Sequence, residues 1–247
     1  MIDFPGKKRL VSLRKKRNRY AENMFVAEGE KIVGELLLSK EVVPVIVYIR
    51  EDKWVEKFDE NKLFVRVNEK KFRQISTLET SQGWLGVFKM PNYVTKPMHL
   101  TFPVLVFDSI RDPGNLGTII RTADWFGIDT IVCSKDSVDV FSPKVVQSSM
   151  GAVVRVKVYY TDLEVFFKSR SEVPLYAFTM NGNNAFNFKI PGQSFLLFGN
   201  ESRGISEKLL TFATKKITIP NFSKKRNKIE SLNVAVSASI VMALSKK

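Results

Sequence analysis

The sequence contains one cysteine, Cys133, and one histidine, His99, in 247 residues. A lone cysteine cannot form a disulfide within the chain, and these two residues are too few for an ordinary zinc site. No stretch approaches the ~20 apolar residues of a membrane-spanning helix. The basic N-terminal stretch lacks the apolar segment and cleavage site of a secretion signal. We therefore expect a soluble cytoplasmic protein with no metal site and no membrane partner.

Positive charge is the main excess, with 39 Lys and Arg against 25 Asp and Glu, a net charge of +14. Both halves are basic, and the charge clusters in KKRLVSLRKKRNR (7–19) and SKKRNK (223–228). Clustered positive charge is typical of proteins that bind polyanions, because phosphate contacts supply most non-specific affinity. We favour nucleic acid as the partner; a solubilising surface or a patch for anionic lipids is the alternative.

The hydrophobic pattern predicts two domains, since 44% apolar residues over this length can build substantial cores. The stretch 90–103 has three prolines and no periodicity. We place an N-terminal domain at 1–92, a linker at 93–103 and a second domain at 104–247.

In both domains apolar stretches of strand type alternate with amphipathic stretches of helix type. The predicted strands cover 24–29, 43–49, 63–67, 83–90, 104–110, 130–134, 154–160, 174–180, 194–198 and 215–220. The predicted helices cover 30–40, 51–58, 116–126, 143–150, 162–170, 205–213 and 232–245. This alternation indicates an α/β fold around a mostly parallel sheet, in which ligands bind beyond the carboxyl ends of the strands.

The first strand-end motif is DSIRDPGNLGTIIRTADWFGI (108–128). We expect Asn115 to cap a helix that carries Thr118 and Arg121 on a polar stripe. The planar fork of an arginine suits phosphate recognition. A capped helix with one solvated arginine is the alternative.

The second motif is SFLLFGNESRG (194–204), in which an apolar strand ends in a polar bend. Gly199 allows close approach of the backbone to a ligand, and Gly204 allows the bend to end. Glu201 is either a capping or ion-pairing residue or part of a polar cluster with Arg121. The dinucleotide fingerprint GxGxxG is absent, which argues against a nucleotide-dependent oxidoreductase.

The third motif is TIPNFSKKRNKIESLNVAVSASIVMAL (218–244). A strand ends at Ile219 and Pro220, a basic loop follows, and we expect Ser231 to cap a final helix. Its alanines and serines allow close packing against another segment of backbone. Alone, this is an ordinary terminal helix.

Together and in this order, the three motifs resemble the SPOUT superfamily, and more narrowly the TrmH/SpoU family of RNA ribose 2′-O-methyltransferases. The resemblance spans about 105–244. FVAEGEKIVGELL and TSQGWLGVFK within residues 1–90 also resemble the substrate-binding domain that often precedes it, which is related to small RNA-binding ribosomal proteins.

The resemblance implies a trefoil-knotted α/β domain, a homodimer and S-adenosylmethionine as the methyl donor. It places cofactor-binding main chain at Gly199, Ile219 and Leu232, and less firmly at Thr179. It implies that Arg121 acts on the 2′-hydroxyl beside the partner subunit's cofactor, and we expect a clamp on a phosphate and the 2′ oxygen. Residues assisting Arg121 are expected to be Asn115, Glu201, Ser231 and Asn233.

RNA contacts are expected at both basic clusters. The predicted residues are Lys7, Lys8, Arg9, Lys15, Lys16, Arg17, Lys224, Lys225 and Arg226. The family usually has a short glycine-containing loop before ESLN, whereas NFSKKRNKI is longer and basic, and it is expected to reach for RNA. Ribosomal RNA is favoured as substrate; transfer RNA, or a non-catalytic RNA-binding assembly factor on the same scaffold, is the alternative.

Overall fold

The computed structural model describes residues 7–58, 60–95, 98–223 and 231–246. The chain divides into two compact units. Unit 1 comprises Met1–Lys96 and Asp139–Val154, and unit 2 comprises Pro97–Val138 and Arg155–Lys247. Within the described ranges, no helix is long and apolar enough to cross a membrane, and no group of three or more His, Cys, Asp or Glu residues could hold a metal ion.

Unit 1 is built on a four-stranded sheet with the strand order β1-β4-β2-β3. Its strands are β1 (Met24–Glu28), β2 (Pro44–Arg50), β3 (Phe64–Val67) and β4 (Trp84–Lys89). Strand β4 runs antiparallel to β1 and β2, and β3 is parallel to β2. The helices within residues 7–96 are α1 (Lys7–Ser12), α2 (Lys16–Glu22), α3 (Glu30–Leu38) and α4 (Glu69–Ile75), with short 3₁₀ turns η1 (Glu51–Lys53), η2 (Glu56–Phe58) and η3 (Asn92–Thr95).

Four helical segments of unit 1 depart from the sequence predictions. The helix expected over 51–58 is two separate 3₁₀ turns, and α4 was not predicted. Helices α1 and α2 were not predicted either, because the basic stretch 7–19 has few apolar residues. Of these, Leu10 and Leu13 are buried in a core cluster that also contains Phe72 of α4.

The segment 139–154, which contains α6 (Pro143–Ser148) and η4 (Ala152–Val154), packs in unit 1 although residues 97–138 and 155–247 form unit 2. The rings of Phe25 and Phe141 lie 5.0 Å apart. Asp139 is buried and accepts hydrogen bonds from the Arg19 guanidinium and from the Tyr20 hydroxyl. Burial and this carboxylate raise the pKa of Tyr20 above its usual range.

Unit 2 is built on a six-stranded sheet in which every neighbouring pair is parallel, in the order β10-β8-β9-β5-β6-β7. Its strands are β5 (Val104–Phe107), β6 (Thr130–Ser134), β7 (Lys157–Thr161), β8 (Leu175–Asn184), β9 (Phe195–Phe198) and β10 (Lys215–Thr218). Its helices are α5 (Pro113–Trp125), α7 (Leu163–Lys168), α8 (Glu207–Leu210) and α9 (Val234–Leu244), with η5 (Ala185–Asn187). The expected α/β architecture, a mostly parallel sheet preceded by a smaller α/β domain, is confirmed.

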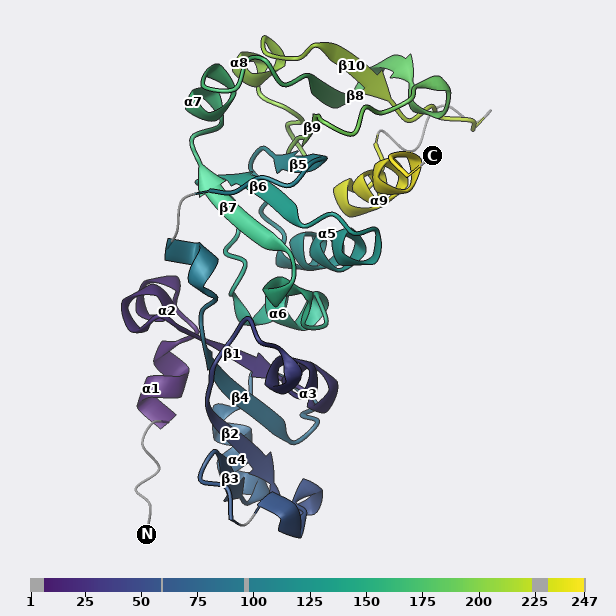
Figure 1. Ribbon diagram of the computed structural model, residues 1–247. Coiled ribbons are helices and arrows are strands. Elements are labelled where there is room, and N and C mark those ends of the chain that lie inside the picture. The colour runs from purple at the N-terminus through teal and green to yellow at the C-terminus, as the bar shows by residue number, and fades with distance from the viewer. Residues whose placement is uncertain (1–6, 59, 96–97, 224–230, 247) are drawn as a thin grey trace. The chain divides into compact units, whose positions relative to one another are not determined.

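The helices of unit 2 pack in two pairs, α7 with α8 and α5 with α9 (Figure 1). Phe166 and Phe167 of α7 are buried with Phe195 of β9 and Leu209 of α8 in one apolar cluster. Between α9 and α5, Ser239 lies 3.5 Å from the hydroxyl of Thr122. This pair of helices brings the start of α9 close to the start of α5, and that junction positions the site.

Candidate functional site

Three polar segments follow strands β5, β9 and β10 at one edge of the unit 2 sheet. Strand β5 ends at Phe107 beside Phe198, the last residue of β9. Strand β10 ends at Thr218 and joins the same sheet through β8. Because parallel strands end at the same edge, the three sequence motifs converge there, as strand-end motifs do in open α/β sheets.

Asn115 links the three segments. Its Nδ2 donates to Glu201 Oε1 at 2.9 Å, and its Oδ1 accepts from Asn233 Nδ2 at 2.9 Å. A primary amide provides a donor and an acceptor on one planar group, so Asn115 can satisfy a carboxylate and a second amide together. Residues 86 and 118 positions away in sequence are thereby joined through one side chain.

Two predicted helix caps are wrong, and the structure shows why. Helix α5 begins at Pro113 with Asp112 as its N-cap, whose Oδ1 accepts from the Asn115 N–H at 2.7 Å. Helix α9 begins at Val234 with Asn233 as its N-cap, not Ser231. Asn233 Oδ1 accepts from Ala235 N at 2.9 Å, which leaves Nδ2 directed to Asn115. Asn115 is therefore free of capping and serves the link between segments.

The bend after β9 is held by Asn200. Its backbone exchanges two hydrogen bonds of 2.9 Å with Gly204, and its Oδ1 accepts from Ser202 N and Arg203 N at 3.0 and 3.2 Å. A Cβ at Gly199 would lie 2.1 Å from the Gly204 carbonyl carbon, far inside contact distance. The chain itself requires glycine at 199, because the bend folds the backbone of Gly204 and Ile205 back against it.

A cavity of about 1200 Å³ opens between the bend, residues 178–180 of β8, the segment that follows β10 and the start of α9. The four residues predicted to bind the cofactor, Thr179, Gly199, Ile219 and Leu232, all line it. Glu201 and Ser231 also line it. Further lining residues, to which the sequence assigned no binding or catalytic role, are Phe178, Met180, Phe198, Asn200, Ser202, Arg203, Gly204, Ile205, Thr218, Pro220, Asn221, Phe222, Ser223, Val234 and Ser237.

Arg121 does not line this cavity. It lies on α5, is exposed, and its side chain has no hydrogen bond or ion pair with the part of the chain that the structure describes. The structure therefore brings Asn115, Glu201, Ser231 and Asn233 to one place and leaves Arg121 outside it. Trp125, one turn further along the same helix, is 85% exposed.

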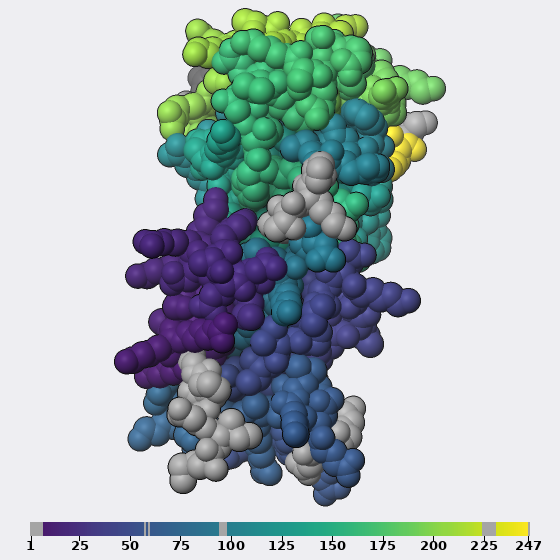
Figure 2. Space-filling model, turned by 60° about the vertical axis from the view of Figure 1, so that its left-hand side comes forward, coloured from purple at the N-terminus to yellow at the C-terminus, as the bar shows by residue number. Residues whose placement is uncertain are grey.

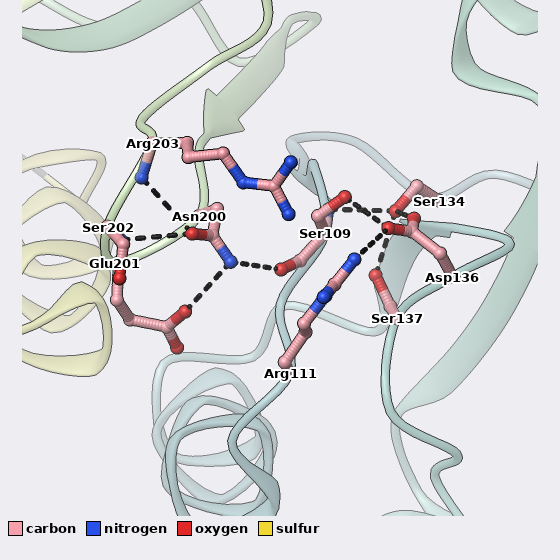
Figure 3. A network of polar contacts seen from close by, with 9 residues as sticks. All are labelled: Ser109, Arg111, Ser134, Asp136, Ser137, Asn200, Glu201, Ser202 and Arg203. Carbon is pink, nitrogen blue, oxygen red and sulfur yellow. Dashed lines mark hydrogen bonds and ion pairs between the residues drawn. The ribbon is translucent and has the colours of Figure 1, made fainter.

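A second polar cluster follows β5 and β6, and the sequence analysis did not identify it (Figure 3). Ser109 has φ +58°, a left-handed conformation that serine rarely adopts. It is held there because its N–H donates to Ser134 Oγ, its carbonyl accepts from Asn200 Nδ2 and its hydroxyl donates to Asp136. Hydrogen bonds from Ser109, Ser134 and Arg111 lower the pKa of Asp136 to about 2. In the sequence, this cluster is indicated only by polar residues that follow each of two apolar strands.

The predicted RNA-binding residues of the first basic cluster lie on or beside α1 and α2 of unit 1. Lys7, Lys8, Arg9, Lys15, Lys16 and Arg17 are all exposed. Figure 2 shows these two helices in purple at the surface of unit 1. Arg9 pairs with Glu22, while Arg19 of the same stretch is buried against Asp139. Lys224, Lys225 and Arg226 lie outside the described residues.

Two family models match the chain. Residues 103–243 match the SpoU rRNA Methylase family, and residues 6–86 match the MRM3-like substrate binding domain. Both matches agree with the resemblance that the motifs predicted.

Among proteins of known name, the chain is 30% identical over 233 residues to the 23S rRNA (guanosine(2553)-2′-O)-methyltransferase RlmP of Bacillus subtilis, covering 93% of this chain and 91% of that protein. It is 32% identical over 169 residues to the mitochondrial rRNA methyltransferase 3 of Mus musculus, covering 63% of this chain but only 40% of that longer protein.

Among solved structures, a TrmH-family protein of Porphyromonas gingivalis is 32% identical, with a TM-score of 0.82 over 99% of this chain and 98% of that one. An AdoMet-bound rRNA methyltransferase of Sinorhizobium meliloti is 26% identical, with a TM-score of 0.84 over 100% of this chain and 95% of that one. With a family model covering more than half of its length and a relative matched from end to end, the chain belongs to the SpoU rRNA methylase family.

Proposed function

We propose that this protein transfers a methyl group from S-adenosylmethionine to a ribose 2′-hydroxyl of ribosomal RNA in the cytoplasm. The observation that carries the proposal is the Asn115 link, which joins Asn233 to Glu201, a residue that lines a large cavity. The names of the Bacillus subtilis and Mus musculus relatives support ribosomal RNA over transfer RNA.

The cavity fits the expected methyl donor. Its volume of about 1200 Å³ exceeds the ~300–1000 Å³ of typical small-molecule sites, which leaves space for a nucleotide beside the cofactor. Its wall combines apolar groups, such as Phe178 and Ile219, with the polar bend at 199–204. Gly199, Ile219, Leu232 and Thr179 are the residues that we propose to hold the cofactor.

The chemistry needs positioning more than activation. When bound, S-adenosylmethionine supplies a methyl carbon on a positively charged sulfur; an oxygen–carbon bond forms as the carbon–sulfur bond breaks, and the hydroxyl proton passes to water. The chain's part is to align the 2′ oxygen with that carbon. Glu201 is fixed by amide donors from Asn115 and Asn200 and keeps lone pairs for a ligand hydroxyl.

Arg121 is proposed to clamp a phosphate and the 2′ oxygen in the active site of a partner subunit. An arginine offers five donors and no acceptor, so a fork that orients oxygens fits its chemistry better than a base does. Its place outside the cavity of its own chain, its exposed side chain and the exposed Trp125 beside it support a homodimer through this region. The basic residues of α1 and α2 and the loop with Lys224, Lys225 and Arg226 are proposed to bind the RNA.

The proposal is tested by incubating the protein with radiolabelled S-adenosylmethionine and either ribosomal or transfer RNA. Label is expected in ribosomal RNA, and Arg121→Ala and Arg121→Lys are both expected to lose at least about 100-fold in rate because the planar fork is lost. A rate for Arg121→Lys near that of the wild type and rising with pH would favour a base role. Label in transfer RNA alone would identify transfer RNA as the substrate. No label in either RNA would favour a non-catalytic RNA-binding assembly factor.

Co-expression of two inactive variants tests the shared site. Arg121→Ala and Gly199→Ala damage different proposed parts, so a mixed dimer keeps one intact site if each site uses Arg121 of one subunit and the cavity of the other. Random mixing should restore about a quarter of the wild-type rate. If both variants are folded and dimeric but no activity is restored, then Arg121 and the cavity of the same subunit form one site.

A further inference from the structure

Two arginines at the cluster after β5 and β6, Arg111 within it and Arg203 on the neighbouring bend, have no role in the proposed reaction. Arg111 donates to Asp136 Oδ2 at 3.3 Å, and 58% of its side chain is exposed. Arg203 lies on the bend after β9 and lines the large cavity. In Figure 3 its guanidinium extends toward Ser109, on the side where the Arg111 guanidinium also lies.

The backbone beneath both arginines is fixed by the same residue. Asn200 accepts from Arg203 N at 3.2 Å and donates to the Ser109 carbonyl at 2.8 Å. Ser109 in turn donates to Asp136, the carboxylate that holds Arg111. Arg111 and Arg203 are therefore presented by one hydrogen-bonded frame, although they are far apart in sequence.

The Arg203 guanidinium has no direct partner in this frame. Asp136 faces Arg111, while the Arg203 side chain has no hydrogen bond or ion pair with residues that the structure describes. The other nearby carboxylates have donors of their own: Glu201 accepts from the side-chain amides of Asn115 and Asn200, and Asp108 and Asp112 accept from the backbone N–H groups of Ser206 and Asn115. Two guanidinium groups on the same side of one frame repel each other, and an anion bound between them offsets that repulsion.

We propose that Arg111 and Arg203 together bind one phosphate of the substrate RNA backbone at the rim of the cavity, with Asp136 positioning Arg111. The inference rests on the proposed function, because it makes the bound anion part of the RNA. A phosphodiester has two unbridged oxygens that match a pair of guanidinium forks, and such contacts fix register without reading sequence. Since Arg203 also lines the cavity, the bound phosphate lies next to the nucleotide that is methylated.

The carboxylate of the methyl donor is the other anion that could reach Arg203. The two sources differ in what they predict. A phosphate of RNA makes the arginines matter for RNA affinity and its salt dependence, whereas a cofactor carboxylate makes Arg203 matter for cofactor affinity alone.

The test compares Arg111→Ala, Arg203→Ala and the control Arg155→Ala. Arg155 is also a surface arginine of unit 2 in an ion pair, with Asp124 at 2.8 Å, so the control removes the same charge elsewhere. Binding of end-labelled ribosomal RNA fragments is measured over a range of salt concentrations, cofactor affinity is measured by calorimetry, and folding is checked by thermal unfolding. These binding measurements do not need methyl transfer.

Each single variant is expected to weaken RNA binding about tenfold and to reduce the slope of log affinity against log salt by about 0.7 to 1. Cofactor affinity and the control should match the wild type. Unchanged RNA affinity and slope in a folded Arg203→Ala protein would overturn the inference, as would a loss confined to cofactor affinity. Failure of the wild type to label RNA would instead overturn the proposed function.

Discussion

At the scale of single residues, the site depends on side chains that satisfy two partners at once. Asn115 donates to Glu201 and accepts from Asn233, and Asn200 does the same between Ser109 and the bend. A primary amide is uncharged and carries a strong donor and a strong acceptor on separate atoms of one plane. Replacement by a carboxylate or by an apolar group therefore breaks at least one bond.

Asn115→Asp is expected to keep the hydrogen bond from Asn233 and to lose the one to Glu201. The carboxylate can still accept from Asn233 but repels Glu201, so we predict loss of about 1 kcal/mol of stability and at least about 100-fold in methyl transfer. Thr118→Ala, on the same helix and exposed, is the matched control and should change neither. Thermal unfolding and initial rates check both, and an Asn115→Asp protein with the wild-type rate would contradict the role of the link.

Asp136 gives a pH dependence with a definite sign. Its pKa is about 2 in the folded protein, below the 3.8 of an ordinary aspartate, so the folded state favours the ionised form. The stability that it contributes is present above pH 3.8 and is lost as the pH falls toward 2. Because 48% of the side chain is exposed, we expect less than about 1 kcal/mol.

Denaturant unfolding of the wild type and Asp136→Asn between pH 5 and about 2 measures this contribution. The wild type should be the more stable at pH 5, and the difference should shrink as the pH falls. A stability difference that stays constant or grows on acidification would show that these hydrogen bonds do not lower the pKa of Asp136.

A substitution at Gly199 tests the close backbone contact within the bend. A Cβ there would lie 2.2 Å from Ile205 N as well as 2.1 Å from Gly204, so Gly199→Ala must open the bend. We predict that cofactor affinity falls at least about tenfold, since the bend lines the proposed cofactor cavity. Gly192→Ala has open space around the new methyl group and should bind normally. Equal calorimetric affinities would contradict a role for the bend in cofactor binding.

At the scale of elements, the sequence predicts the presence of the strands of unit 2 better than their ends or the starts of the helices. Apolar runs identify β5, β9 and β10 because burial of a strand is a local property of the sequence, and the predicted end of β9 at Phe198 is confirmed. Strands β5 and β10 end three and two residues before their predicted ends. Asp112, Asn115, Ser231 and Asn233 are all residues that cap helices well. The choice among them depends on the contact between Asn115 and Asn233, 118 positions apart, which no local pattern contains.

The segment 139–154 is the clearest case of such a non-local effect. Its sequence predicts a helix near 143–150, which agrees with α6, but not its place in unit 1. That place depends on the buried pair of Arg19 and Asp139 and on the packing of Phe25 with Phe141. An arginine within a basic run gave no sign that it would be buried.

Arg19→Ala is therefore expected to loosen this segment. Removing one partner of a buried ion pair leaves the other uncompensated and costs about 3 kcal/mol or more. Backbone hydrogen exchange in residues 139–154 should become faster, and the midpoint temperature of the first thermal unfolding transition should fall. Arg17→Ala, exposed on the same helix, should change stability by less than about 0.5 kcal/mol. Unchanged exchange in Arg19→Ala would contradict the anchoring role.

At the scale of the whole molecule, two basic units serve one polyanionic substrate. The net charge of +14 draws RNA to the surface without selecting a nucleotide, and the exposed lysines and arginines of α1 and α2 extend that attraction over unit 1. We propose that unit 2 selects the reacting atom, because it contains the Asn115 link, the bend and the cavity. The central claim is therefore that the methyl group goes to the ribose and not to a base.

Alkaline hydrolysis of labelled RNA tests that claim most directly. Alkali cleaves RNA through the free 2′-hydroxyl, so a methylated ribose protects its linkage and the label remains in dinucleotides. After incubation with radiolabelled S-adenosylmethionine and ribosomal RNA, we predict label in alkali-resistant dinucleotides, and little or none with Asn115→Asp. Label recovered only in single nucleotides, as methylated bases, would contradict the account.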